Sequence, residues 1–143
     1  MPDIYQEYLE REKQKLSYRV RGAIFEVHAK LGLGLYEECY QQALLHEFQL
    51  RGIKAEGKVQ VPVIYKGVEV KDAYEIDILV EDKIILELKS VEELSRRHFK
   101  QLLNYLHLKN LYLGFLINFN CETLDKDNFC RVFNNQATDQ TDI

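Results

Sequence analysis

The stretch Tyr74–Ser90, YEIDILVEDKIILELKS, decides the fold of this chain. Its apolar residues form two β-patterned segments joined by a short charged turn, which predicts an antiparallel hairpin. Asp77, Glu87 and Lys89 interrupt these apolar segments. Two carboxylates and an ammonium are costly to bury unless another charge compensates them. A divalent metal ion bound by the carboxylates would compensate them, which points to phosphodiester chemistry.

The spacing of these three residues sets a condition on the hairpin turn. Glu87 and Lys89 are two positions apart, so they lie on one face of their strand. Asp77 can lie opposite Glu87 on that face only if the numbers of paired residues sum to 164. This register requires a loop with an odd number of residues, most simply 81–83, because a two-residue turn would send Asp77 to the other face. We therefore predict a three-residue turn, or a bulge that restores the phase.

Asp77 and Glu87 have the chemistry of ligands for a hard divalent cation. Mg²⁺ and Mn²⁺ take oxygen ligands, commonly one or two carboxylates with water and substrate phosphate, and the backbone carbonyl of Leu88 is a further candidate ligand. Such a metal polarises a scissile phosphate and lowers the pKa of a bound water. Lys89 would position that water and offset charge in the transition state. Taken alone, the pattern is more often a surface ion pair on the open face of an antiparallel sheet.

A glycine turn followed by an acidic residue precedes the hairpin. Gly34, Glu37 and Tyr40 lie in the string GLYEECY, at the start of a helix that we expect from about 36 to 51. Glu37 and Tyr40 are three positions apart and share a helical face. By itself Glu37 is explained as a first-turn carboxylate that complements the helix dipole. The functional interpretation makes Glu37 a third metal ligand and Tyr40 a contact of the substrate.

A second motif lies on the helix expected after Lys89, where the chain carries His98, Gln101 and Tyr105. Gln101 and Tyr105 are four positions apart, so both can face the site. Gln101 is a candidate for binding phosphate or water, and Tyr105 for donating to phosphate or stacking on a base. The alternative is a surface glutamine and a tyrosine at the edge of the core. His98 is also a candidate contact, although such a histidine more often caps or pairs locally.

The rest of the chain alternates between helical and strand patterns. Apolar spacing predicts a helix from about 7 to 31, one from 36 to 51, and one that ends near 108 and begins after a cap at Ser90 or Ser95. Strands are expected at 59–65, 68–80, 84–89 and 111–117, with a possible edge strand at 129–133. The order α-α-β-β-β-α-β indicates a single α/β structure with a mixed central sheet flanked by helices.

The bulk composition restricts the class of protein. The chain has 143 residues, 46% hydrophobic and 29% charged, which fits one globular domain over 1–133 and a loose polar tail over 134–143. A net charge of −4 counts modestly against non-specific nucleic-acid binding. The N-terminus has no apolar leader pattern, and no apolar run approaches the about 20 residues of a membrane span. We therefore expect a cytoplasmic protein whose three cysteines are reduced.

Three strings in this order, GLYEECY, D…ELK and HxxQxxxY, resemble the GxxExxY family of the PD-(D/E)XK nuclease superfamily over about residues 16–133. The resemblance implies a restriction-endonuclease-like core and a metal-dependent nuclease. It implies that Asp77 and Glu87 bind Mg²⁺ or Mn²⁺, that Lys89 assists the attacking water, and that Glu37 completes the metal site. The glutamine and tyrosine of the later helix resemble the QxxxY motif of a recombination-exonuclease branch.

Two functions from different classes stay open on the sequence alone. The first is a metal-dependent nuclease that hydrolyses nucleic-acid phosphodiesters, with DNA the expected substrate. The second is a non-catalytic nucleic-acid-binding or regulatory module on the same fold, which the acidic net charge and the small size favour. Specific metal binding separates the two. A homodimer formed through the first helix or a sheet edge is a further expectation.

Overall fold

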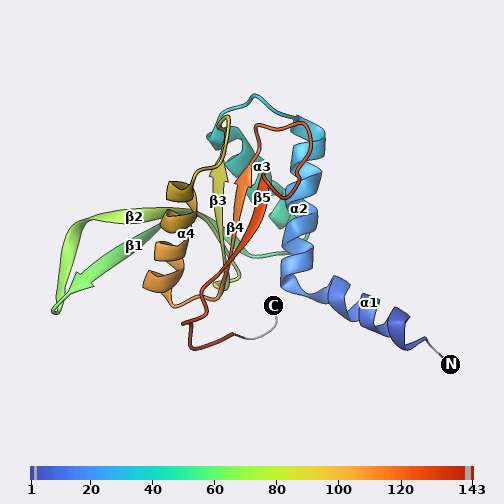
Figure 1. Cartoon of the computed structure of the whole chain (residues 1–143), viewed down its shortest axis with the longest axis horizontal. Coiled ribbons are helices and arrows are strands. Elements are labelled where there is room, and N and C mark those ends of the chain that lie inside the picture. Colours follow the sequence, from blue (N-terminus) through green and yellow to red (C-terminus); the bar gives the residue numbers. More distant parts are fainter. Residues whose placement is uncertain (2, 141–142) are drawn as a thin grey trace.

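The computed structural model describes residues 1–143 except 2, 141 and 142, and the side chains of 71–73 also lie outside the described residues. The helices are α1 Ile4–Gln14, α2 Leu16–Leu31, α3 Glu37–Leu50 and α4 Arg96–Lys109. The strands are β1 Ala55–Tyr65, β2 Val68–Val80, β3 Ile84–Lys89, β4 Leu113–Asn118 and β5 Phe129–Phe133. Figure 1 shows the long β1–β2 hairpin extending from one side of the domain and α1 from the other.

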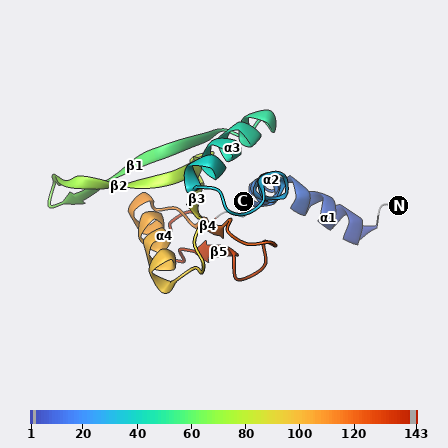
Figure 2. The same ribbon diagram turned by 90° about the horizontal axis from the view of Figure 1, so that it is seen from above.

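The strands form one five-stranded sheet in the order β1-β2-β3-β4-β5. Only the β3–β4 pair is parallel, and the other three pairs are antiparallel. Helix α4 connects the parallel pair, as a crossover between parallel strands requires. Helices α2 and α3 cover one face of the sheet and α4 covers the other (Figure 2). The predicted α/β architecture with a mixed, helix-flanked sheet is confirmed, and the edge strand at 129–133 is present.

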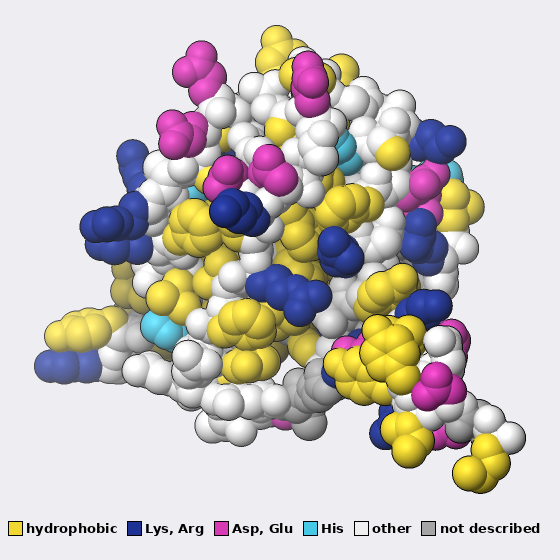
Figure 3. All heavy atoms as spheres, turned by 45° about the vertical axis from the view of Figure 1, so that its right-hand side comes forward, with side chains coloured by type: hydrophobic (Ala, Val, Ile, Leu, Met, Phe, Trp, Pro, Cys, Tyr) yellow, Lys and Arg dark blue, Asp and Glu magenta, His cyan; other side chains and the backbone are white. Residues whose placement is uncertain are grey.

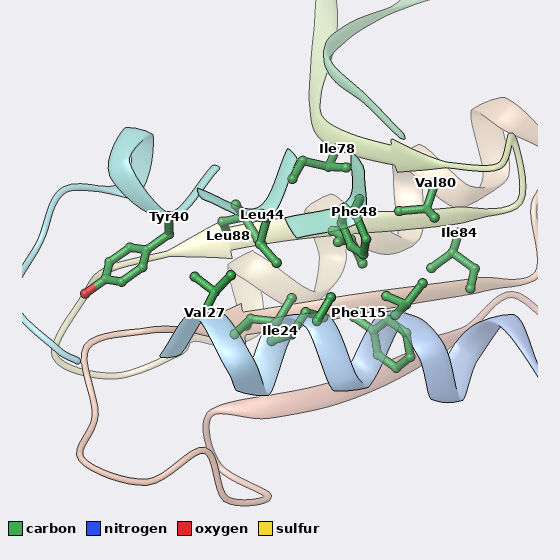
Figure 4. Close-up of a cluster of buried hydrophobic side chains, with 14 of the residues drawn as sticks. Ile24, Val27, Tyr40, Leu44, Phe48, Ile78, Val80, Ile84, Leu88 and Phe115 are labelled. Atoms are coloured by element: carbon green, nitrogen blue, oxygen red, sulfur yellow. The ribbon is translucent and has the colours of Figure 1, made fainter. Parts of the chain in front are cut away.

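The larger apolar cluster lies between the sheet and helices α2 and α3. Tyr40, Leu44 and Phe48 of α3 are fully buried. They pack in one cluster with Ile24 and Val27 of α2 (Figure 4). Burying an apolar side chain of this size contributes about 1.5–3 kcal/mol relative to leaving it exposed. This cluster therefore fixes α3 against the sheet, with the first residue of α3 close to the end of β3.

The smaller apolar cluster lies on the opposite face, under α4. It joins Leu102, Tyr105 and Leu106 of α4 with Leu79 of β2 and Ile85 of β3. Strand alternation from Ile85 places Glu87 and Lys89 on this same face. Helix α4 is therefore the helix that packs beside them, as its position directly after β3 predicts.

The helix predicted from 7 to 31 is two helices. Lys15 has φ −63° and ψ 143°, an extended conformation that ends α1 and precedes α2. Helix α1 buries no residue, and it projects from the domain (Figure 1). None of the described helices combines the length and apolar character that crossing a bilayer requires.

The segment after β5 contacts the domain. The Asn134 side-chain amide is buried and donates to the carbonyl oxygens of Leu106 at 3.4 Å and Leu111 at 3.1 Å. At the end of the chain, the Ile143 carbonyl accepts from the Ser17 N–H at 2.5 Å. The predicted looseness of 134–143 stays a prediction about motion, and two of its residues, 141 and 142, lie outside the described residues.

Candidate functional site

The β2–β3 hairpin has the register that the charged residues require. The strands pair from Val80 with Ile84 to Ile78 with Leu86, so paired numbers sum to 164 and the loop is the three-residue segment 81–83. Two residues of this loop, at 81 and 82, have φ near +50° (52° and 55°), which turns the chain tightly. The predicted three-residue turn is confirmed, and the continued register places position 77 opposite position 87.

The pairing of β2 with β3 stops at Ile78, so the two strands separate at Asp77; we call this point of separation the fork. Strand β2 stays paired with β1 on both sides of the fork, and the β1–β2 hairpin leaves the body of the sheet (Figure 1). Ile76 and Ile78 are both fully buried, yet they pack in the clusters on opposite faces of the sheet. Strand β2 therefore turns its faces over between them, and Asp77 lies at this turn.

At the fork, the carboxylates of Asp77 and Glu87 accept hydrogen bonds from backbone N–H groups that no longer pair between β2 and β3. The Asp77 N–H donates to Glu87 Oε1 at 3.2 Å, and the Leu88 N–H donates to Asp77 Oδ2 at 2.8 Å. Gln41 of α3 also fixes the backbone at Asp77, because its Nε2 donates to the Asp77 carbonyl at 2.8 Å. These contacts fix both carboxylates to the backbone.

Each of the two carboxylates keeps a second oxygen for another partner. Oδ1 of Asp77 and Oε2 of Glu87 accept no hydrogen bond among the described residues. No buried polar side-chain atom in the described part of the chain lacks a partner, so neither of these two oxygens is fully shut off from solvent. Carboxylate oxygens without a partner in the protein are donors that suit a hard divalent cation.

Burial raises the pKa of both carboxyl groups. Glu87 is 3% exposed. Its burial and, second, the charge of Asp77 raise its pKa to about 8. Burial also raises the pKa of Asp77, against the opposing effects of the Leu88 hydrogen bond and the Lys89 charge. A bound cation would favour the ionised form of both groups, so the electrostatics of the pair fit a divalent metal.

Glu37 is the first residue of α3, and its carboxylate reaches the end of β3. Its Oε1 accepts from the Ser90 N–H at 3.3 Å, while the Ser90 hydroxyl donates to the Leu35 carbonyl at 2.7 Å. Glu37, Asp77 and Leu88 line one hollow of about 100 Å³. No group of three or more acidic, histidine or cysteine side chains with metal-binding geometry occurs among the described residues. Glu37 therefore borders the carboxylate pair without forming a three-residue ligand set with it.

Lys89 is the last residue of β3, and its ammonium contacts α4. Nζ donates to Gln101 Oε1 at 3.4 Å. Within the described residues, neither Asp77 nor Glu87 comes within 4.0 Å of this nitrogen. The alternative of a direct surface ion pair between Lys89 and these carboxylates is therefore not the arrangement in the structure. Lys89 and Gln101 act as a pair at the rim of the fork.

Tyr105 of α4 lies beside both carboxylates. Its burial and, next, the charges of Glu87 and Asp77 raise its pKa to about 12, so it remains a phenol that can donate at neutral pH. Its ring contacts the exposed ring of Tyr74 on β2, with centroids 5.6 Å apart. Sequence reasoning missed Tyr74; its signal is its position three residues before Asp77 in the same strand.

His98 caps the start of α4, which is the local role that the sequence left as the alternative to a substrate contact. The Ser95 N–H donates to His98 Nδ1 at 3.0 Å, which completes a capping box at the start of α4. Ser95, not Ser90, is therefore the cap of this helix. Burial, followed by the nearby charge of Lys89, lowers the pKa of His98. The lowered pKa favours the neutral ring that accepts this hydrogen bond.

Tyr40 does not reach the surface, which corrects its assignment as a substrate contact. The side chain is fully buried and stacks on Phe119 with centroids 4.3 Å apart. Its hydroxyl donates to the Gly32 carbonyl at 2.6 Å and accepts from the Leu35 N–H at 3.2 Å. Tyr40 therefore shapes the glycine turn that delivers Glu37 to the site.

Gln41 and Ser90 are further residues that the sequence interpretation missed. Gln41 is four positions after Glu37 and so shares its helical face, which is the signal that could have found it. Ser90 directly follows the ExK string, but its link to the glycine turn spans 55 positions of sequence. Such a contact depends on how distant elements pack and has no local pattern.

Comparison with known proteins agrees with this geometry. Residues 14–132 match the family model described as the PD-(D/E)XK nuclease superfamily. The matched segment contains the fork, the end of β3 and helix α4. No curated protein and no solved structure gave a significant match to the chain.

Proposed function

The chain belongs to the PD-(D/E)XK nuclease superfamily, and on that premise we propose that it is a metal-dependent nuclease of the GxxExxY family. The observation that carries the proposal is the fork: Asp77 and Glu87 lie together where β2 leaves β3, each with one free oxygen. Lys89 follows on the same face of β3. Such an arrangement is costly in a metal-free protein and useful for hydrolysing phosphodiesters.

Mg²⁺ or Mn²⁺ is the proposed cofactor. Asp77 and Glu87 would hold it, with Glu37 and the Leu88 carbonyl as further candidate ligands because Glu37 and Leu88 border the same hollow as Asp77. When bound, such a metal polarises the scissile phosphate and makes hydroxide available near neutral pH. Binding requires both carboxyl groups to be ionised, and Glu87 must release the proton that its raised pKa favours.

The chain's own side chains position the reactants. Lys89 provides positive charge that offsets developing charge on the phosphate. Gln101 accepts from Lys89 Nζ and so orients that ammonium, while its own amide N–H groups can donate to phosphate or water. Tyr105 contributes a phenol donor or a ring face for a base.

DNA is the nucleic acid that we propose as substrate, and assays with matched DNA and RNA oligonucleotides test this choice.

A reducing compartment such as the cytoplasm is the proposed location. Its support is that the three cysteines, Cys39, Cys121 and Cys130, are free.

A homodimer is the proposed assembly, with α1 as its contact element. Helix α1 exposes Ile4, Tyr5 and Tyr8, at 82%, 62% and 52% of their surface. Figure 3 shows hydrophobic side chains gathered on this projecting segment at the lower right. Light scattering on the protein and on a Tyr5→Ser/Tyr8→Ser variant tests this contact. A monomeric mass for both proteins would remove it.

A non-catalytic nucleic-acid-binding module is the second candidate function. The observation that favours it is that Asp77 and Glu87 each accept a backbone hydrogen bond. The carboxylates therefore stabilise the backbone at the fork even without a metal. Metal-dependent cleavage separates the two candidates.

The test is cleavage of fluorescent single- and double-stranded oligonucleotides with Mg²⁺ or Mn²⁺. Asp77→Asn keeps an oxygen for the Leu88 N–H and removes the charge, so the fork should persist while cleavage is lost. Glu69→Gln, at an exposed position of β2 outside the hollow that Asp77 borders, is the matched control and should cleave normally. Equal cleavage by Asp77→Asn and wild type would overturn the catalytic role. Oligonucleotide binding without cleavage by wild type would support the second candidate.

A further inference from the structure

Lys58 of β1 lies across the β1–β2 ladder from Asp77, between two paired positions. Positions 57 and 59 of β1 pair with positions 78 and 76 of β2, so position 58 faces position 77 across the ladder. Lys58 also lines the hollow of about 100 Å³ that Glu37, Asp77 and Leu88 border. A second lysine therefore belongs to the fork, on the strand next to the metal-binding candidates.

The backbone at Lys58 is left-handed, with φ 54°, inside a strand. This conformation is unfavourable for residues with a Cβ, and glycine or asparagine adopts it more readily. Strand β1 also changes faces here, because Gly57 approaches Leu45 of α3 whereas Val59 packs in the cluster under α4. The kink explains the left-handed backbone, but it does not explain a lysine at this position.

The surroundings of the Lys58 ammonium are acidic. The hollow is also lined by Glu38 and Glu75, in addition to Glu37 and Asp77. Lys58 Nζ lies 3.2 Å from Glu38 Oε1, and the two side chains are 54% and 58% exposed. An exposed pair of this kind contributes little to stability and is screened by salt, so an incoming anion can replace the Glu38 carboxylate.

We propose that Lys58 binds a backbone phosphate of the nucleic acid at the fork. This inference rests on the proposed function and names a residue that holds its substrate. The strand order β1-β2-β3 places Asp77 between Lys58 on one side and Lys89 on the other. A nucleic-acid strand that crosses the fork thus meets a cation on each side of the carboxylates.

The hairpin offers a matched control for this lysine. Lys66, in the turn between β1 and β2, is also left-handed, with φ 47°, and is exposed far along the hairpin from the fork. Lys58→Gly and Lys66→Gly each remove one positive charge, and each replaces a lysine in the left-handed backbone conformation with a residue that adopts it readily. Both variants should therefore keep the fold, with Tm raised by about 2–4 °C. Only Lys58→Gly should change nucleic-acid binding.

The experiment measures binding of a fluorescent DNA oligonucleotide by anisotropy in Ca²⁺, over a range of KCl concentrations. For Lys58→Gly we expect about fivefold weaker binding, and a slope of log K against log salt reduced by about 0.7–0.9, the value for one lost phosphate contact. Lys66→Gly should match wild type in both quantities. Lys58→Asn, which tolerates the same backbone, is the second variant and should behave as Lys58→Gly.

Equal affinity and equal salt slope for Lys58→Gly and Lys66→Gly would overturn the inference. Because the readout is binding, its failure is distinguishable from a failure of the proposed catalysis. A wild-type protein that binds but does not cleave would remove the nuclease proposal and leave the lysine comparison valid. A wild-type protein that binds no oligonucleotide would overturn both.

Discussion

Replacing Glu87 with glutamine should stabilise the metal-free protein at pH 8. Glu87 is 3% exposed beside Asp77, and its pKa is raised to about 8. Glutamine has nearly the same shape and keeps an oxygen that can accept the Asp77 N–H, which lies 3.2 Å from Glu87 Oε1. The substitution therefore removes the buried charge while it preserves the hydrogen bond.

The magnitude follows from the two pKa values of Glu87. Between pH 4.5 and about 8 the folded protein retains a proton that the unfolded chain has released. Because the folded state binds more protons there, wild-type stability falls as pH rises through this interval. Each pKa unit corresponds to about 1.36 kcal/mol, so the loss is on the order of a few kcal/mol. In a chain of this length the corresponding difference in Tm is on the order of 10 °C.

The assay is thermal unfolding in EDTA at pH 5, 6, 7 and 8. The Tm advantage of Glu87→Gln over wild type should be small at pH 5 and should grow steadily to pH 8. Glu75→Gln is the control, because Glu75 is exposed and accepts from Gln60 at 2.8 Å without being buried. A Tm advantage that does not change with pH, or a Glu87→Gln variant less stable than wild type at pH 8, would show that a buried Glu87 charge does not destabilise the metal-free protein.

Other perturbations of the site have equally definite outcomes. Mn²⁺ should raise the Tm of wild type more at pH 8 than at pH 6, because metal binding competes with the Glu87 proton. Mn²⁺ should leave the Tm of Glu87→Gln nearly unchanged, and thermal unfolding with and without metal checks both expectations. Lys89→Met should lower metal-dependent cleavage by about 100-fold or more while the urea midpoint stays within error, and wild-type rates from this variant would contradict its role. Tyr40→Phe should cost about 1–2 kcal/mol in urea unfolding, because the Gly32 carbonyl loses its donor, yet the folded variant should still cleave.

The hairpin register was predictable because strand periodicity leaves few solutions. A single odd loop puts Asp77 opposite Glu87, and the pairing of Val80 with Ile84 has that phase. The inner face of α3 was predictable for the same reason, since Tyr40, Leu44 and Phe48 repeat every four residues.

Other features depend on contacts between distant segments and were not predictable. The break at Lys15 falls inside a helical pattern, and just after it the Ser17 N–H donates to the carbonyl of Ile143 at the other end of the sequence. The hydrogen bond from Gln41 to the Asp77 carbonyl and the left-handed Lys58 are set by the way β1, β2 and α3 meet at the fork. No local sequence pattern encodes that meeting point.

Calorimetric titration of Mn²⁺ into the protein determines whether Asp77 and Glu87 bind a metal ion. The measurement is made at pH 7 in two buffers of different ionisation enthalpy, with an Asp77→Ala/Glu87→Ala variant beside wild type. We expect saturable binding to wild type with release of about one proton, because burial and the charge of Asp77 raise the pKa of Glu87 to about 8 before metal binds. We expect no saturable binding to the double variant. Heats from wild type that match those of the double variant would contradict the claim that these carboxylates hold a metal.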